Sequence, residues 1–279
     1  MISQSLVCSL TVRRLLGAAL GLAALCPASL HAQAAETVSL AERLEILKQA
    51  YPSAIRDVSG GTLRLATGAE LVIDDGRQKS HQDKLKNADI EDMLSQVYPL
   101  GECETGKPAR NFDPGRIRSD AFMRAVYGNS RSAVAQTLVS IPWFGSKVQV
   151  TRVAGVDKAL RAVAADLAKL PRKYRRVFAK SAGTFNWRFI AGTQRLSVHS
   201  FAAAIDVNTK YADYWRWSGG QPGNVPTYRN KVPRAVVDVF ERHGFIWGGK
   251  WYHYDTMHFE FRPALIAIAR LFEKRGCGR

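Results

Sequence analysis

Two short stretches of this chain carry residues that can bind a metal ion. The first, SVHSFAAAID, places His199 and Asp206 seven positions apart around a run of alanines. A straight helix would separate their backbones by roughly 10 Å and a straight strand by roughly 23 Å, so the chain must turn if both contact one ion. A buried alanine-rich strand explains the same letters, and this stretch alone leaves both interpretations open.

The second stretch, WYHYDTMHFEF, holds Asp255 and His258 at the start of a predicted strand. Alternation along a strand puts His258 and Glu260 on one face and the phenylalanines on the other, so His258 can face a site. With His199 and Asp206 it completes a set of two imidazoles and one carboxylate, which is typical of a catalytic zinc site. Asp255 is then placed to act as general base toward a water molecule.

The two stretches, extended to RLSVHSFAAAIDVN and GFIWGGKWYHYDTMHFEFRP, resemble the signature blocks of a zinc peptidase family. It contains the VanY-type D-alanyl-D-alanine carboxypeptidases and the L-alanyl-D-glutamate endopeptidases, and its blocks read SxHxxGxAxD and acidic-x-x-His. The matching positions are Ser197, His199, Ala204, Asp206, Asp255 and His258. Ala202 stands where the family has glycine, which leaves the geometry of the turn open. The resemblance implies zinc (Zn2+) bound by His199, Asp206 and His258, with Asp255 as catalytic base.

Other candidate residues surround these blocks. FNWRFIAGTQRLS resembles the lead-in to the first block, which implies Arg188 as the cation that stabilises the oxyanion, with Arg195 as its rival. His253 is an alternative ligand to His258, and Glu260 is a partner of His258 or a substitute base. Three further sets are expected to be structural: His243 as a helix cap, His81 as a solvated side chain, and the aromatic residues Tyr211, Tyr214, Trp215 and Trp217 as local core.

The resemblance implies an α+β fold of the Hedgehog/D,D-peptidase type, with a small antiparallel sheet that carries the zinc site and is flanked by helices. The implied activity is hydrolysis of amide bonds in peptidoglycan stem peptides. An aspartate at position 255 favours an L-alanyl-D-glutamate endopeptidase over a D-alanyl-D-alanine carboxypeptidase, which usually has glutamate there. The alternative is a non-catalytic, zinc-stabilised cell-wall-binding module, against which Asp255 and Arg188 argue.

The first 34 residues have the pattern of a secretory signal peptide. Arg13 and Arg14 precede the apolar run LLGAALGLAALCPASL, and AQA is a small-x-small cleavage pattern. An uncleaved anchor is disfavoured because the run is short and contains Pro27. Lipidation at Cys26 is disfavoured because Leu25 stands where a small residue is expected. We therefore expect a protein exported across the inner membrane, periplasmic or associated with the cell wall, with no membrane span.

Charge and cysteine usage agree with export. The formal net charge of +16 implies an anionic partner or anionic surroundings, with a merely solvated basic surface as the alternative. In an exported protein, anionic cell-wall polymer, a membrane surface or acidic peptides such as peptidoglycan stem peptides fit better than nucleic acid. Beyond the signal peptide only Cys103 and Cys277 remain, without CxxC spacing. Because the compartment is oxidising, we expect them to form a disulfide.

The remaining pattern predicts two parts. An N-terminal subdomain over residues 35–106 contains predicted helices at 39–51 and 88–98 and a hairpin at 62–73 around Gly68. The zinc peptidase domain covers 115–279. It begins with predicted helices at 119–128 and 156–170 and a strand at 147–153, and a long loop follows at 208–232. A helix from Pro233 to Gly244 and strands at 245–249 and 258–261 complete it.

Overall fold

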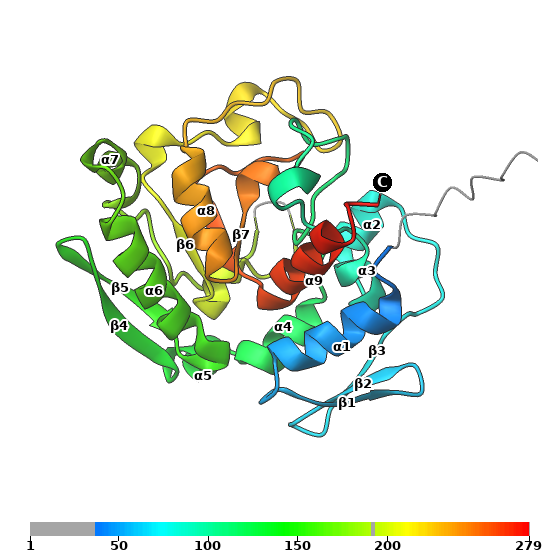
Figure 1. Ribbon diagram of the computed structural model, residues 1–279. Helices are drawn as coiled ribbons and strands as arrows, with labels where there is room; N and C mark the ends of the chain where they lie inside the picture. The colour runs from blue at the N-terminus through cyan, green and yellow to red at the C-terminus, as the bar shows by residue number, and fades with distance from the viewer. Residues whose placement is uncertain (1–36, 191–192, 279) are drawn as a thin grey trace, which may run out of the picture. The chain divides into compact units, whose positions relative to one another are not determined.

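Small antiparallel sheets carry the strands of this protein (Figure 1). The structure is a computed structural model that describes residues 37–190 and 193–278. One sheet contains β1 (Ile55–Ser59), β2 (Thr62–Leu65) and β3 (Glu70–Val72), and β4 (Leu138–Trp143) pairs with β5 (Ser146–Thr151). A third sheet has the order β6 (Ala204–Asp206), β8 (His258–Phe261), β7 (Phe245–Trp247). These sheets and the helices confirm the predicted α+β class.

The helices are α1 (Leu40–Ala50), α2 (His81–Lys86), α3 (Ile90–Leu94), α4 (Asp120–Tyr127), α5 (Arg131–Ala135), α6 (Val156–Ala168), α7 (Arg175–Phe178), α8 (Arg234–Arg242) and α9 (Pro263–Lys274). The described residues contain four of the predicted helices with similar bounds, the fifth in a shorter form, and four helices that were not predicted: α2, α5, α7 and α9. Ser39 and Glu42 form the expected capping box of α1, and Pro233 precedes α8. None of the helices in the described residues is long and apolar enough to cross a membrane.

The helix expected over 88–98 is wrong in its length, because α3 ends at Leu94. The guanidinium of Arg43 on α1 donates to the carbonyl oxygens of Leu94 and Ser95 at 2.7 and 3.3 Å. Gln96 then turns away and donates to a backbone carbonyl 15 residues later. Contacts with distant parts of the chain therefore replace the last helical turn.

The third sheet has one face toward the core and one toward the candidate site. On the core face, the ring of Phe259 stacks on Phe240 of α8 with centroids 3.9 Å apart, and both side chains are fully buried. His258 and Glu260 lie on the other face and contact each other, as the alternation predicts. Burial of the phenylalanines fixes which face of β8 the histidine presents.

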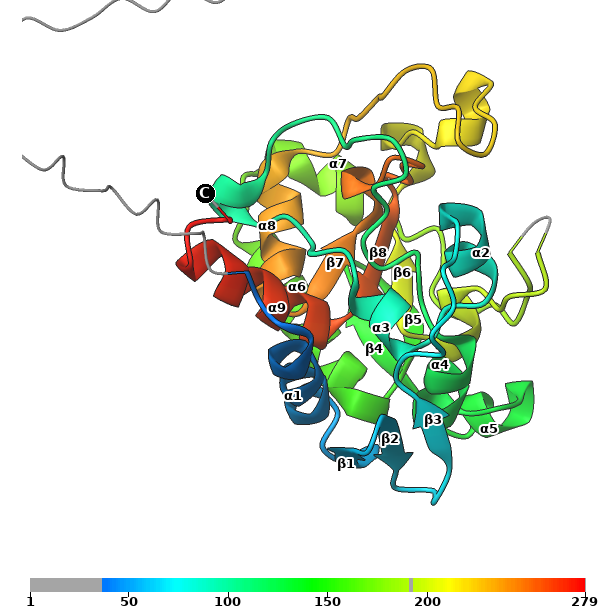
Figure 2. The same cartoon turned by 90° about the vertical axis from the view of Figure 1, so that its right-hand side faces the viewer.

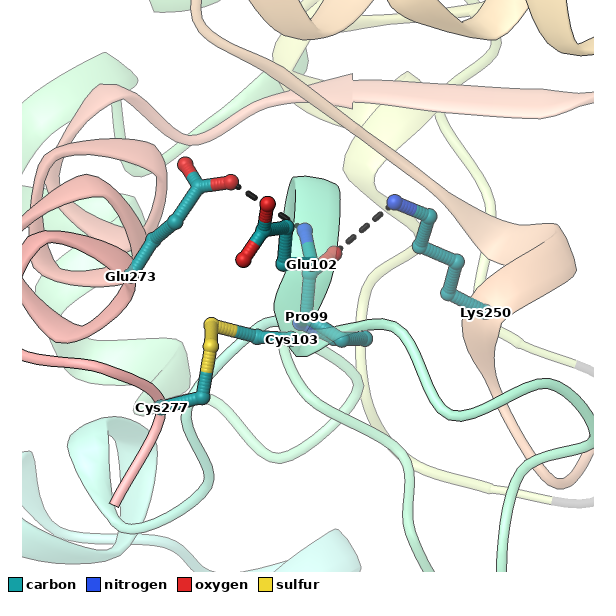
Figure 3. The surroundings of a disulfide bond; sticks show 6 residues. All are labelled: Pro99, Glu102, Cys103, Lys250, Glu273 and Cys277. Carbon is teal, nitrogen blue, oxygen red and sulfur yellow. Dashed lines mark hydrogen bonds between the residues drawn. A yellow bond between two sulfur atoms is a disulfide. The ribbon is translucent and has the colours of Figure 1, made fainter. Parts of the chain in front are cut away.

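The N-terminal segment packs on the C-terminal helix. Figure 1 shows α1 (blue) beside α9 (red), and Glu42 forms an ion pair with Arg275 at 2.6 Å. The predicted disulfide is confirmed: Figure 3 shows Cys103 joined to Cys277, which lies 174 residues later in the chain. In the same view Lys250 donates to the carbonyl of Pro99 at 2.8 Å. Many contacts thus join residues 37–106 to the rest of the chain. The predicted boundary between an N-terminal subdomain ending at 106 and a peptidase domain beginning at 115 stays a prediction.

The predicted signal peptide, residues 1–34, lies outside the described residues.

Candidate metal centre

Three predicted ligands converge on one point. Asp206 and His258 are paired directly across β6 and β8, and His199 lies in the 3-10 turn Val198–Phe201 just before β6. His199 Nε2 lies 3.2 Å from both His258 Nδ1 and Asp206 Oδ1, and His258 Nδ1 lies 3.0 Å from Asp206 Oδ1. Donor atoms about 2.0–2.1 Å from a tetrahedral zinc ion are about 3.3 Å apart, so the spacing fits zinc.

The turn between His199 and Asp206 occurs at Ala202. Its φ of 52° and ψ of 29° are left-handed helical, and its side chain is fully buried. Glycine adopts this conformation without strain, whereas alanine costs roughly 1–2 kcal/mol. The chain therefore keeps, with alanine, a backbone geometry that suits the glycine of the family pattern.

Hydrogen bonds on the far side of each imidazole fix which nitrogen is free for metal. His199 Nδ1 lies 3.0 Å from the carbonyl oxygen of Thr184, which can only accept, so Nδ1 carries the proton and Nε2 has the lone pair. His258 Nε2 lies 3.1 Å from Glu260, leaving Nδ1 free in the neutral ring. Two lone pairs and a carboxylate at such short separations repel unless a cation or proton lies among them. The donor set therefore suits a divalent metal ion.

The charge states of His258 and Glu260 depend on the neighbouring residues in this site. Burial opposes a charged imidazole, but hydrogen bonds to Asp206 and Glu260 raise the pKa of His258 to about 10. Burial likewise opposes a charged Glu260, yet His258, Arg262 and Arg118 lower its pKa to about 2. Arg262 Nη1 donates to Glu260 Oε1 at 3.0 Å. Glu260 is thus an ionised partner of His258, one of the two roles expected for it.

Asp255 feels the charges of the three candidate ligands but does not join their group. Its Oδ1 is buried and accepts no hydrogen bond from the described residues. Burial, and then the negative charge of Asp206, raises the pKa of this carboxyl group. The Asp255 N–H donates to Gly248 at 3.0 Å, and a β-carbon at position 248 would lie 2.4 Å from the Asp255 carbonyl oxygen. Glycine at 248 therefore permits the backbone approach that positions this unpaired carboxylate.

The two candidate arginines occupy different surroundings. Arg188 is exposed, and its backbone pairs with Ser197 and Ser200 at the entry to the histidine turn. Arg195 is 7 % exposed, and its Nη2 donates to the carbonyl of Arg116 at 2.9 Å. Which of the two contacts substrate stays a prediction.

A second group of two histidines and one aspartate was missed. The prediction that His81 is solvated is wrong: its Nε2 lies 3.0 Å from buried Asp113, with 11 % of the side chain exposed. His253 Nδ1 also contacts Asp113, at 2.7 Å, and its Nε2 accepts from Gly223 N–H. His253 Nδ1 therefore donates its proton to Asp113, and His253 does not join His199. No short-range spacing links these residues, so only the fold reveals the group.

The expected cap role of His243 agrees with the structure, whereas the prediction that the loop aromatics are local core is wrong for Trp217, which is 62 % exposed. His243 caps α8 and contacts Asp166 at 2.8 Å. Trp215 is buried with Tyr254 and Val225 in a small cluster of its own.

The ligand types, their spacing and the fixed imidazoles define a site typical of mononuclear zinc hydrolases. Residues 191–261 match the model of a protein family described as D-alanyl-D-alanine carboxypeptidase. This segment contains His199, Asp206, Asp255 and His258, and the match confirms the resemblance to VanY-type zinc peptidases and supports a peptidase. No curated protein and no solved structure matches the chain.

Proposed function

We propose that this protein is a zinc-dependent peptidase that hydrolyses amide bonds in peptidoglycan stem peptides. The convergence of His199 Nε2, Asp206 Oδ1 and His258 Nδ1 within 3.2 Å of one another is the main support. The matched peptidase family is the second support. Export to the periplasm or cell wall, where the substrate occurs, belongs to the same proposal.

Asp255 carries the proton transfers in this mechanism. Zinc, when bound, would polarise the scissile carbonyl and acidify water in the site. The Asp255 carboxylate takes a proton from the attacking water and later gives it to the leaving amine. Its raised pKa makes it a better base than an ordinary aspartate, and its buried Oδ1 has no competing hydrogen bond. Arg188 is proposed to stabilise the developing oxyanion.

The bond between L-alanine and D-glutamate is the preferred substrate bond. The support is the aspartate at position 255, since the family's D-alanyl-D-alanine enzymes usually have glutamate at the base position. A non-catalytic wall-binding module would need zinc for folding but would not need an unpaired base beside it. The orphaned oxygen of Asp255 thus favours the enzyme.

Mass spectrometry of muropeptides after incubation with the zinc-loaded protein tests the proposal. The wild type is expected to release products, and Asp255→Asn is expected to keep its fold and zinc while its rate falls at least ~100-fold. Asp238→Asn on α8, where the aspartate is partly exposed and pairs with Arg234, is the matched control. An Asp255→Asn protein with wild-type rate would refute the assigned base, and a zinc-loaded wild type without any hydrolysis would favour the binding module.

A further inference from the structure

A cavity of about 710 Å³ is lined in part by residues that neighbour the candidate base Asp255. Tyr214, which lines it, forms an isolated antiparallel bridge with Asp255, and His253, two positions before Asp255, lines it as well. Helix α2 also supplies Leu85 and Lys86 to the lining. In Figure 2, α2 and the segment 193–195 lie on the same side of the molecule. The cavity is therefore placed to receive a part of the substrate that extends from the scissile bond.

The lining carries an excess of positive charge. Its cations are Lys86, Arg116, Arg195 and Arg216, and its one acidic residue is Asp120. Asp120 already pairs with Arg124 at 2.7 Å. Within the described part of the chain, Lys86, Arg116 and Arg195 form no ion pair with a carboxylate. An anion in this cavity would meet three cations that form no ion pair among the described residues, although the negative charges of Asp120 and Glu260 act on Arg195.

Arg195 shows this imbalance most clearly. Its side chain is 7 % exposed, and one backbone carbonyl, that of Arg116, accepts from it. Burial, together with the positive charges of Arg118 and Arg116, lowers the pKa of Arg195 to about 8. Holding an unpaired buried guanidinium costs free energy, and a bound anion would offset that cost. Arginine also binds carboxylates with two parallel hydrogen bonds.

We propose that this cavity binds a free carboxylate of the stem peptide through Arg195, Arg116 and Lys86. This inference rests on the proposed function. Two carboxylates qualify: the α-carboxylate of D-glutamate and the C-terminal carboxylate of D-alanine. The proposal also assigns a role to the segment before the family match, because α2 contributes Lys86 to the substrate site. The contact between His81 and Asp113 fixes α2 in this position.

Binding of synthetic stem pentapeptides by isothermal titration calorimetry tests the proposal. Zinc-loaded Asp255→Asn protein is titrated with the free acid, with the glutamate α-carboxylate amidated, and with the C-terminus amidated. We expect one amidation to weaken binding about 10- to 100-fold, the value for a lost charge-assisted hydrogen bond. The amide that weakens binding identifies the carboxylate.

Variants in the same background connect the effect to the cavity. Arg195→Met is expected to lose the preference for the free acid, Arg195→Lys to keep part of it, and Lys86→Met to reduce it about 2- to 5-fold. Lys147→Met, an exposed lysine on β5, removes the same charge elsewhere and should leave binding unchanged. Thermal unfolding and zinc content check the fold of each variant. If Arg195→Met does not fold, Lys86→Met still tests the proposal, because Lys86 is exposed and its replacement should not disturb the fold.

The outcomes separate this proposal from the proposed function. Equal affinity for acid and amide peptides, or an equal preference in Arg195→Met and in the parent protein, overturns the carboxylate site even if the wild type hydrolyses muropeptides. A preference for the free acid that depends on Arg195, together with a zinc-loaded wild type that hydrolyses no muropeptide, supports the carboxylate site and overturns the enzyme.

Discussion

Glu260→Gln tests whether the metal centre depends on the partner of His258. Glu260 is 1 % exposed and accepts from His258 Nε2 at 3.1 Å with one oxygen and from Arg262 at 3.0 Å with the other. A glutamine offers one acceptor oxygen, so one of these buried donors faces an NH2 group, at about 1–3 kcal/mol. The imidazole then loses its fixed orientation. We expect zinc affinity to fall about 10- to 100-fold, or about 1.4–2.7 kcal/mol.

Competition with a chromogenic zinc chelator at neutral pH measures this change. Glu241→Gln is the matched control, because Glu241 is also buried, at 5 % exposure, and accepts from Tyr98 and Lys250 away from the three ligands. That variant should lose stability and keep its zinc affinity. If Glu260→Gln binds zinc as tightly as the wild type, or loses no more affinity than Glu241→Gln, the role assigned to Glu260 is wrong.

Three further predictions concern pH and stability. The pKa of His258 is raised to about 10 in the metal-free chain, so zinc must displace a proton from this imidazole. The apparent zinc affinity should therefore rise about tenfold per pH unit between roughly pH 6 and 8. Chelator competition at several pH values measures this slope, and an affinity that does not change with pH contradicts the raised pKa. The raised pKa of His258 also stabilises the metal-free fold: the contribution is fully present at pH values below 6.5, the ordinary pKa of histidine, and is lost as the pH rises toward 10. Replacing both Cys103 and Cys277 by serine opens a link across 174 residues and should lower the free energy of unfolding in urea by about 2–5 kcal/mol, whereas an unchanged midpoint would argue against it. Asp113→Asn leaves a buried donor of His253 without its acceptor and should cost about 1–3 kcal/mol at neutral pH. Burial opposes a charged Asp113, but hydrogen bonds from His253 and His81 lower the pKa of its carboxyl group. The wild type should therefore be more stable than Asp113→Asn above about pH 4, and this difference in stability should shrink as the pH falls. Thermal unfolding of both proteins at decreasing pH measures the difference, and a difference that does not change with pH would contradict the assignment.

Local signals in the sequence were sufficient for several elements. The capping box of Ser39 and Glu42 marks the start of α1, and Pro233 marks the start of α8, because these residues act on the nearest backbone groups. The disulfide was also predictable, since the proposed export would leave Cys103 and Cys277 as the remaining thiols in an oxidising compartment. These inferences need no knowledge of long-range packing.

Features that depend on distant contacts could not be predicted. The helix expected over 88–98 ends early because the side chain of Arg43 binds carbonyl oxygens at its end, and Arg43 lies more than 50 residues from Ser95 in the chain. His81 is drawn from an apparently solvated segment to Asp113, which His253 also contacts from 140 residues later. The cationic cavity combines Lys86 with residues near 195 and 214 and has no linear signature. Each of these arises only after the sheets and helices pack.

The convergence of His199, Asp206 and His258 was predictable because two of these residues are tied to the register of two short strands. Asp206 pairs with His258, and Ile205 with Phe259, so a shift of one residue would turn Asp206 toward the core and Ile205 toward the site. Full burial of Ile205 and Phe259 makes that shift unfavourable. The left-handed turn at Ala202 then returns His199 to the same face. The alternating apolar residues thus specify the site as much as its ligands do, and a polar residue at 205 should disturb metal binding without touching a ligand.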